Sequence, residues 1–167
     1  MIIRDEEEND HAATRSVNIS AFETPSEANL VDTLRAQATP VVSLVAEEND
    51  IVVGHIMFSP VTLSGHPELK AIGLAPMAVI PEHQRAGIGS ALVRAGLEQC
   101  KQLGFVAVVV LGHPEYYPRF GFSPSSRFGI VSEYDVPEEV FMAMEPHPNA
   151  LDKKAGKVKY HAAFGSL

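Results

Sequence analysis

The sequence predicts one α/β domain, residues 1–167, in which a β-hairpin precedes a β-α-β unit. Two apolar runs, 41–46 and 51–60, flank the turn-like Glu48-Asn49-Asp50 and indicate the hairpin. An amphipathic helical pattern at 87–103 separates two strand-like runs and indicates the β-α-β unit. A chain of this length buries roughly 70% of its unfolded surface, so one core is enough to stabilise it.

The first 60 residues predict a short strand and two helices before the hairpin is complete. Pro25-Ser26 is a typical helix start, and Leu30, Val31 and Leu34 form one apolar stripe. In chain order, we expect a strand at 2–3, helices at 8–22 and from 25 to before Pro40, and strands at 41–46 and 51–60.

The remaining elements follow from the apolar pattern and from single prolines and glycines. The strand-like run 69–80 contains Pro76, which cannot donate to a sheet ladder and so marks a bulge or an unpaired edge. Gly104 is a natural cap for helix 87–103. We then expect a strand at 105–111, a short helix at 114–120, and closing strands at 129–131 and 140–144. The tail shows no pattern, so we treat 146–167 as an extension of a core of about 1–145.

The charge of the chain is concentrated in its first third. There are 13 basic and 21 acidic residues, a formal net charge of −8. The first 50 residues hold the whole excess, since their only basic residues are Arg4, Arg15 and Arg35. Such a domain repels a phosphate backbone, which argues against nucleic-acid binding. The acidic residues either lie in solvated turns and aid solubility, or form a patch that attracts a cationic amine.

Composition excludes several other classes. The single cysteine, Cys100, rules out an internal disulfide framework and a multi-cysteine zinc site, and its place on the apolar side of a helix predicts a buried thiol. No pair of histidines has zinc-site spacing, so we expect no metal. The longest apolar run is too short to span a bilayer, and the N-terminus is acidic, unlike a signal peptide. We therefore expect a cytoplasmic protein without a membrane partner.

Gly87 and Gly89 stand where a strand and a turn lead into helix 87–103. Glycine inside a helix costs about 1 kcal/mol relative to alanine, so these two serve either tight packing or the close approach of a ligand. The free N–H groups of a first helical turn carry partial positive charge and bind phosphate. A dinucleotide fingerprint needs a third small residue where Leu92 stands, and no Gly-Lys-Ser/Thr loop for a nucleoside triphosphate is present.

Two sequence blocks give a more specific resemblance. Gln84-Arg85-Ala86-Gly87-Ile88-Gly89 fits the Gln/Arg-x-x-Gly-x-Gly/Ala motif of the GNAT superfamily of N-acetyltransferases. Tyr116-Tyr117-Pro118-Arg119-Phe120-Gly121-Phe122 resembles the Tyr-x-x-x-Gly-Phe signature of the same family. One helix and one strand separate the blocks, as in the family. The chain is most similar to the small bacterial YhbS-like group.

The resemblance implies a GNAT fold, with a mixed and mostly antiparallel sheet flanked by helices. Its fourth and fifth strands splay apart, and the pantetheine arm of acetyl-CoA, the implied cosubstrate, enters the gap. Backbone N–H groups from Arg85 to Ser90 would then bind the diphosphate. The cofactor-binding residues implied in this way are Met77, Ala78, Val79, Gln84, Arg85, Ala86, Gly87, Ile88, Gly89 and Ser90. Arg85 and Arg119 are candidates for phosphate contacts.

The resemblance also implies two catalytic groups. The backbone N–H of Val79 would stabilise the oxyanion, and Tyr117 would donate to the departing thiolate, with Tyr116 as its rival. Many relatives carry a glutamate base on the fourth strand, but none of the residues Leu74–Ala78 titrates. The base is therefore open among His55, His113, Glu23, Glu27 and water.

The implied activity is the transfer of an acetyl group to a primary amine by direct attack on the thioester. The acceptor is a small molecule or a peptide, and the acidic first third favours a cationic amine such as a polyamine, an aminoglycoside or a protein amine. The alternative is a non-catalytic acyl-CoA-binding or regulatory module of the same fold. Strand edges in this fold often pair, which makes a homodimer plausible.

Overall fold

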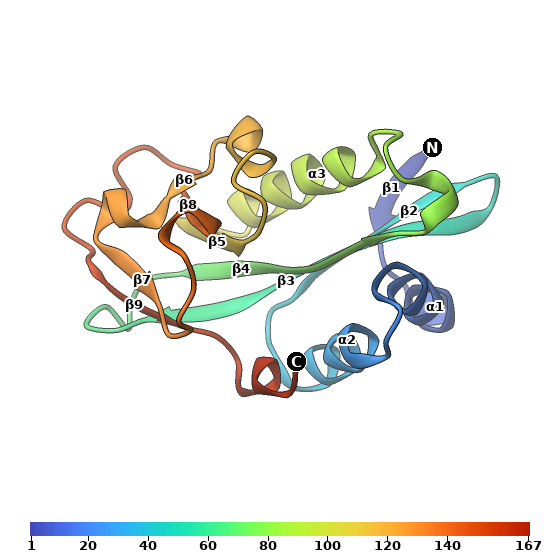
Figure 1. The fold of residues 1–167 in the computed structure, drawn as a ribbon, viewed down its shortest axis with the longest axis horizontal. Helices are drawn as coiled ribbons and strands as arrows, with labels where there is room; N and C mark the ends of the chain where they lie inside the picture. The colour runs from blue at the N-terminus through green and yellow to red at the C-terminus, as the bar shows by residue number, and fades with distance from the viewer.

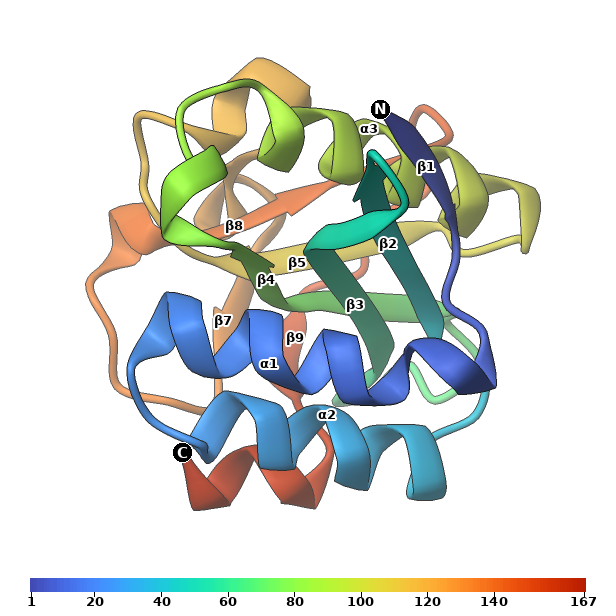
Figure 2. The same cartoon turned by 90° about the vertical axis from the view of Figure 1, so that its right-hand side faces the viewer.

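A twisted mixed sheet forms the centre of the protein, as expected from the fold class. The computed structural model describes residues 1–167, except for the side chain of Ser166. Its main strand order is β1-β2-β3-β4-β5-β8-β6, and β9 joins β3 to β7. Helix α3 covers one face, and helices α1 and α2 cover the other (Figures 1 and 2). No helix in this description is long and apolar enough to cross a membrane.

The regular elements follow one another without long structureless loops. The helices are α1 (His11–Phe22), α2 (Ser26–Gln37) and α3 (Ile88–Gln102). The strands are β1 (Ile2–Asp5), β2 (Val42–Glu48), β3 (Ile51–Leu63), β4 (Ala71–Val79), β5 (Ala107–Leu111), β6 (Ser123–Pro124), β7 (Ile130–Ser132), β8 (Phe141–Met144) and β9 (Gly156–Lys159). Short 3-10 turns are η1 (Glu8–Asp10), η2 (Pro81–His83), η3 (Tyr117–Phe120), η4 (Ser125–Phe128), η5 (Glu138–Val140) and η6 (Ala162–Ser166).

The predicted β-α-β unit is confirmed as β4, α3 and the parallel strand β5. Gly87 begins α3 with φ 85°, and Gly104 ends its last turn with φ 87°. Gly96 on α3 allows close packing on the sheet, because an added Cβ would lie 2.2 Å from the ring of the buried Phe58. The cysteine of α3, Cys100, is buried as predicted, and burial raises the pKa of its thiol to about 12.

Strands β4 and β5 separate halfway along their length. They pair only over Ala71–Leu74 and Ala107–Val110, so β4 continues to Val79 without β5 beside it. The predicted irregularity at Pro76 is confirmed, because the β3–β4 register shifts there. Two residues of β4, Ala75 and Pro76, stand opposite the single residue Met57 of β3, which is a bulge. The bulge lies where β4 leaves β5.

The tail after Pro146 is ordered against the sheet, which its sequence did not predict. Strand β9 pairs with Thr62–Leu63 of β3 and with β7, and the tail residues Leu151, Val158 and Phe164 are buried. Strand β3 therefore extends three residues beyond the predicted end. The expected helix at 114–120 is also shorter, since it consists of the turn η3 alone. The sequence does not predict β9 or the end of β3 because these two segments, which pair with each other, lie far apart in the chain.

Candidate active site

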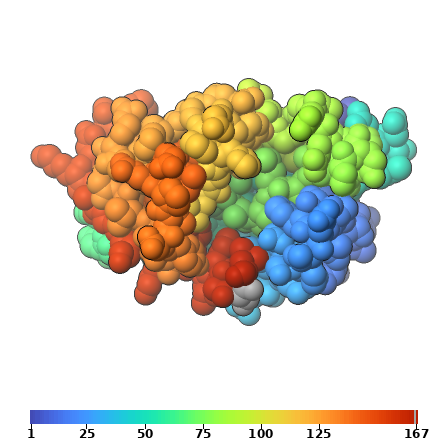
Figure 3. Space-filling model, viewed as in Figure 1, coloured from blue at the N-terminus to red at the C-terminus, as the bar shows by residue number. Residues whose placement is uncertain are grey.

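Two cavities lie at the separation of β4 and β5. The first, about 370 Å³, is lined by Val79, His83, Gln84, Arg85, Gly87, Ile88, Gly89, Ser90, Tyr116 and Arg119. The second, about 360 Å³, is lined by Phe22, Glu27, Leu30, Leu74, Ala75, Pro76, Met77, Leu111, Gly112, His113, Tyr117 and Leu167. We call them the turn cavity and the acceptor cavity. Figure 3 shows the surface hollowed between the α1–α2 segment and the later part of the chain, with β4 at the floor.

The turn cavity is formed around the first turn of α3. The first helical hydrogen bond runs from the Ala91 N–H to the Gly87 carbonyl, so the N–H groups of Ile88, Gly89 and Ser90 have no acceptor within the helix. No side chain caps this end. Arg85, with φ 65°, precedes the left-handed Gly87, and such alternation turns successive N–H groups toward one point. The turn therefore presents several donors and partial positive charge to an anion.

Tyr116 closes the turn cavity from the η3 side. Its hydroxyl lies 3.0 Å from the Ser90 Oγ, and a Cβ added to Gly89 would lie 3.4 Å from it. The Arg119 guanidinium stacks 4.6 Å from the Tyr116 ring centroid, while its Nε donates to the Tyr116 carbonyl. Arg85 and Arg119 thus place two positive charges at the rim of this cavity.

Val79 at the end of β4 has its N–H on the open edge of the strand. The next residue, Ile80, donates to the Val53 carbonyl of β3, and alternate residues of a strand turn their backbone groups to opposite edges. The Val79 N–H therefore points away from β3, toward the gap left by β5. The Val79 carbonyl accepts from the Gln84 side chain at 2.9 Å, so Gln84 fastens the turn to the strand.

Tyr117 faces the acceptor cavity, whereas its neighbour Tyr116 faces the turn cavity. Only 7% of Tyr117 is exposed, and burial together with nearby Tyr116 raises the pKa of its phenol to about 12. The ring packs edge-on against Phe122, with centroids 5.7 Å apart. It lies directly over Gly112, where an added Cβ would stand 2.3 Å from the ring. A side chain at residue 112 would displace the tyrosine.

The structure brings two of the four candidate bases to the acceptor cavity, Glu27 and His113. Glu23 is exposed in the α1–α2 loop and does not line the cavity. His55 is fully buried on β3, and both its ring nitrogens lie in hydrogen bonds within the protein. The sequence-based assignment of His55 as a candidate base is therefore not supported by its position.

The His55 imidazole belongs to a buried polar chain that links the N-terminal elements. Asn18 Nδ2 donates to its Nδ1 at 3.2 Å, which leaves the proton on Nε2 to be donated to the Ser43 Oγ at 2.9 Å. The Ser43 hydroxyl donates to Glu6, and Arg35 holds that carboxylate with two hydrogen bonds. Burial lowers the pKa of His55 to about 4, so the ring is neutral at pH 7.

Most of the residues predicted from the motifs meet at these two cavities. Ala78 and Ala86 line neither; Ala78 is buried and pairs with His55 across β3 and β4. No local pattern predicts Phe22, Leu30 and Leu111, which reach the acceptor cavity only through tertiary packing, and Gly112 lines it too. Gly112 follows an apolar strand, and a glycine at that place is a weak indication of close approach.

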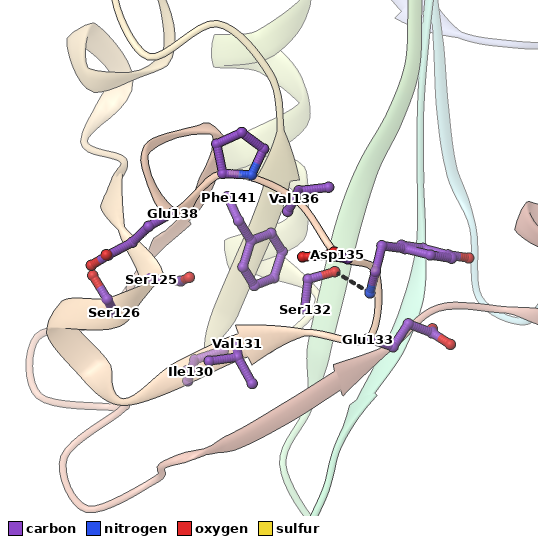
Figure 4. A pocket seen from close by; sticks show the side chains of 12 residues that line it. Ser125, Ser126, Ile130, Val131, Ser132, Glu133, Asp135, Val136, Glu138 and Phe141 are labelled. Carbon is purple, nitrogen blue, oxygen red and sulfur yellow. Dashed lines mark hydrogen bonds between the residues drawn. The ribbon is translucent and has the colours of Figure 1, made fainter.

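A further cavity of about 540 Å³ lies within the segment 125–141, away from the separated strands. Figure 4 shows this segment curled around Phe141, with the Ser132 Oγ accepting from the backbone N–H of Tyr134. No residue of the two site cavities lines it. Across the described side chains, no three His, Cys, Asp or Glu residues are grouped to hold a metal ion.

Comparisons with known proteins agree with this arrangement. The Acetyltransferase (GNAT) family matches residues 7–122. The uncharacterized N-acetyltransferase YjhQ of Escherichia coli (strain K12) is 40% identical over 137 residues, covering 80% of this chain and 76% of that protein. The uncharacterized N-acetyltransferase YhbS of the same strain is 34% identical over 145 residues, covering 86% of each.

Solved structures give the same result. The crystal structure of Escherichia coli YhbS in complex with CoA superposes with a TM-score of 0.92 at 33% identity, covering 98% of this chain and 91% of that chain. A GNAT family acetyltransferase from Brucella melitensis in complex with acetyl-CoA gives a TM-score of 0.80 at 38% identity, covering 98% and 97%. The split sheet, the glycine turn and these likenesses together show that the chain belongs to the GNAT acetyltransferase family.

Proposed function

We propose that residues 1–167 form one domain that transfers an acetyl group from acetyl-CoA to a primary amine. One observation carries the proposal: the separation of β4 from β5 lies between a cavity with free backbone N–H groups and a cavity that holds a buried tyrosine. The YhbS structure with CoA and the Brucella structure with acetyl-CoA support the same cosubstrate here.

The residues around the turn cavity fit the diphosphate of CoA. The N–H groups from Gly87 to Ser90 would hold its oxygens, and glycine at 87 and 89 leaves the approach open. Arg85 and Arg119 would add charge to the phosphate contacts. The open edge of β4 at Met77–Val79 would hydrogen-bond the pantetheine arm as an added strand does.

Acetyl-CoA supplies the acetyl group as a thioester, and in the proposed reaction the C–N bond to the amine forms as the C–S bond breaks. The Val79 N–H, on the open edge of β4, would donate to the carbonyl oxygen as it gains negative charge. An ammonium group must first lose one proton to solvent to become a neutral nucleophile, and its nitrogen must give up a second proton as the C–N bond forms. We assign the role of proton acceptor to His113, whose imidazole lines the acceptor cavity.

Tyr117 would stabilise the sulfur as it leaves with the electron pair of the C–S bond. A phenol with a pKa of about 12 is a weaker acid than a thiol, whose pKa is about 8.5. Complete proton transfer from Tyr117 would therefore cost roughly 5 kcal/mol. A hydrogen bond to the thiolate has no such cost, so Tyr117 acts as a donor, and the proton that neutralises the sulfur comes finally from the amine through solvent.

A coupled assay tests the proposal. CoA release is measured with a panel of amines for wild type, Tyr117→Phe and the control Tyr134→Phe, whose ring lies outside both site cavities. Loss of a hydrogen bond to a charged group predicts a kcat about 10- to 100-fold lower in Tyr117→Phe, with the CoA dissociation constant unchanged. If CoA binds but no amine yields CoA release, the proposal fails and the non-catalytic CoA-binding module takes its place.

A further inference from the structure

We infer that the acceptor is a small primary amine with one positive charge and an apolar body. Glu27 would hold its ammonium form, which loses a proton to solvent before the nitrogen attacks. This inference rests on the proposed function, because it concerns the same acceptor cavity. It narrows the amine from the wide class that the sequence suggests, which included polyamines and aminoglycosides.

The walls of the acceptor cavity are mostly apolar. Leu30 and Phe22 come from the helices, and Leu74, Pro76 and Leu111 come from the separated strands. Apart from the chain end, its titratable side chains are Glu27, His113 and Tyr117. The volume of about 360 Å³ is near the lower end of the roughly 300–1,000 Å³ typical of ligand sites, and it must also hold the thioester. Little room remains for a large polar acceptor.

Glu27 is available to an ammonium group. It is half-buried at the start of α2, and its Oε1 accepts a hydrogen bond from the Thr24 hydroxyl at 3.3 Å. None of the ion pairs among the described side chains involves Glu27. A carboxylate beside apolar walls gains more from one cation than an exposed carboxylate does, because the surrounding dielectric is lower.

The rim of the cavity suits an apolar body. Phe22, at the end of α1, is 36% exposed, and Leu111, at the end of β5, is 37% exposed; both line the cavity. Exposed apolar side chains are ordinary when single, but two around one opening offer a continuous surface to a ligand. An amine with an aliphatic or aromatic group would cover both.

The acidic excess of the first third lies elsewhere. Among its eleven acids, only Glu27 lines the acceptor cavity. Arg4 and Arg35 neutralise several of the others, and a separate groove near the β2–β3 turn collects Asp10, Glu47, Asp50 and Glu82. Among these acids, we therefore assign the contact with the amine to Glu27 alone. A polycation would meet one side-chain carboxylate at the acceptor cavity, not several.

A matched amine panel tests the inference. The rate of CoA release is measured with isopentylamine and 2-phenylethylamine, and with spermidine and kanamycin, for wild type, Glu27→Gln and the control Glu23→Gln in the loop before α2. We expect kcat/KM at least about 10-fold higher for the two monoamines, and a KM at least about 10-fold higher in Glu27→Gln. Glu23→Gln stays within about 2-fold of wild type, and kcat changes less than KM in both variants.

The outcomes separate this inference from the proposed function. Faster turnover of spermidine or kanamycin, or an unchanged KM in Glu27→Gln, overturns the inference and leaves amine acetylation standing. A fall in kcat at constant KM in Glu27→Gln also overturns it, because it makes Glu27 the proton acceptor. Absence of turnover with all four amines, while calorimetry shows CoA binding, overturns both.

Discussion

Mild acid is expected to destabilise the protein through His55. The ring is fully buried and neutral, and burial lowers its pKa from the model-compound value of 6.5 to about 4. Between these two pH values the unfolded chain binds a proton that the native protein does not, so stability falls as the pH is lowered. The stability that His55 contributes is complete above pH 6.5 and is lost as the pH falls toward 4.

The magnitude follows from the two pKa values. A difference of one pKa unit corresponds to about 1.4 kcal/mol, so the full loss approaches roughly 3.4 kcal/mol below pH 4. Lowering the pH from 7.5 to 5.0 covers about 2 kcal/mol of it, before most carboxylates titrate. The hydrogen-bonded chain from the ring through Asn18, Ser43, Glu6 and Arg35 reaches α1, β2 and α2, so we expect cooperative unfolding instead of local change.

Urea unfolding followed by circular dichroism measures this effect at pH 7.5 and 5.0. From pH 7.5 to 5.0, the free energy of unfolding of wild type is expected to fall by about 2 kcal/mol more than that of His55→Gln, which has no imidazole at residue 55. The control His147→Gln, at an exposed position, is expected to behave as wild type does. The His55→Gln variant itself is expected to be less stable at pH 7.5. Equal losses in wild type and His55→Gln would refute the reasoning.

Three further changes test the packing and the charges of the site. Gly112→Ala places a Cβ 2.3 Å from the Tyr117 ring and so displaces the tyrosine. The kcat for CoA release is therefore expected to fall at least about 10-fold, while the CoA affinity measured by calorimetry stays within about 3-fold. An unchanged kcat would contradict this packing. In Gly96→Ala the added Cβ would lie 2.2 Å from the buried Phe58 ring, so the free energy of unfolding is expected to fall by about 1–3 kcal/mol in spite of the higher helix propensity of alanine. A higher urea midpoint than that of wild type would show that the ring moves aside without cost. Arg119→Ala is expected to weaken CoA binding about 10-fold at low salt and less at high salt, as titrations at two ionic strengths would show; a loss independent of salt would contradict a charge contact.

The β-α-β unit and the turn cavity were predictable because their signals are local. The period of α3, the glycines at its start and the proline at Pro76 each act within a few residues of the chain. Local spacing also distinguishes this turn from a dinucleotide fingerprint, since Leu92 stands at the third small position. The family motifs then pointed to the elements on which we propose the cosubstrate site.

The acceptor cavity and the tail were not predictable in the same way. Phe22 and Leu111 are 89 positions apart and line one cavity only because α1 packs on β3 and β4. Strand β9 has a partner in β3 almost 100 residues earlier, and its four residues carry no alternation long enough to recognise. The burial of His55, one of the candidate bases in the sequence, depends on hydrogen-bond partners from α1 and β2.

The central claim is that the first turn of α3 holds the diphosphate of CoA. Isothermal titration with CoA measures it most directly in wild type, Gly89→Val and the control Ala91→Val, which is in the same helix but outside the turn cavity. The account predicts micromolar binding to wild type, a loss of at least about 100-fold in Gly89→Val because its side chain covers the N–H groups, and a change within about 3-fold in Ala91→Val. Equal affinity of wild type and Gly89→Val for CoA, or no binding to wild type at millimolar concentration, would contradict it.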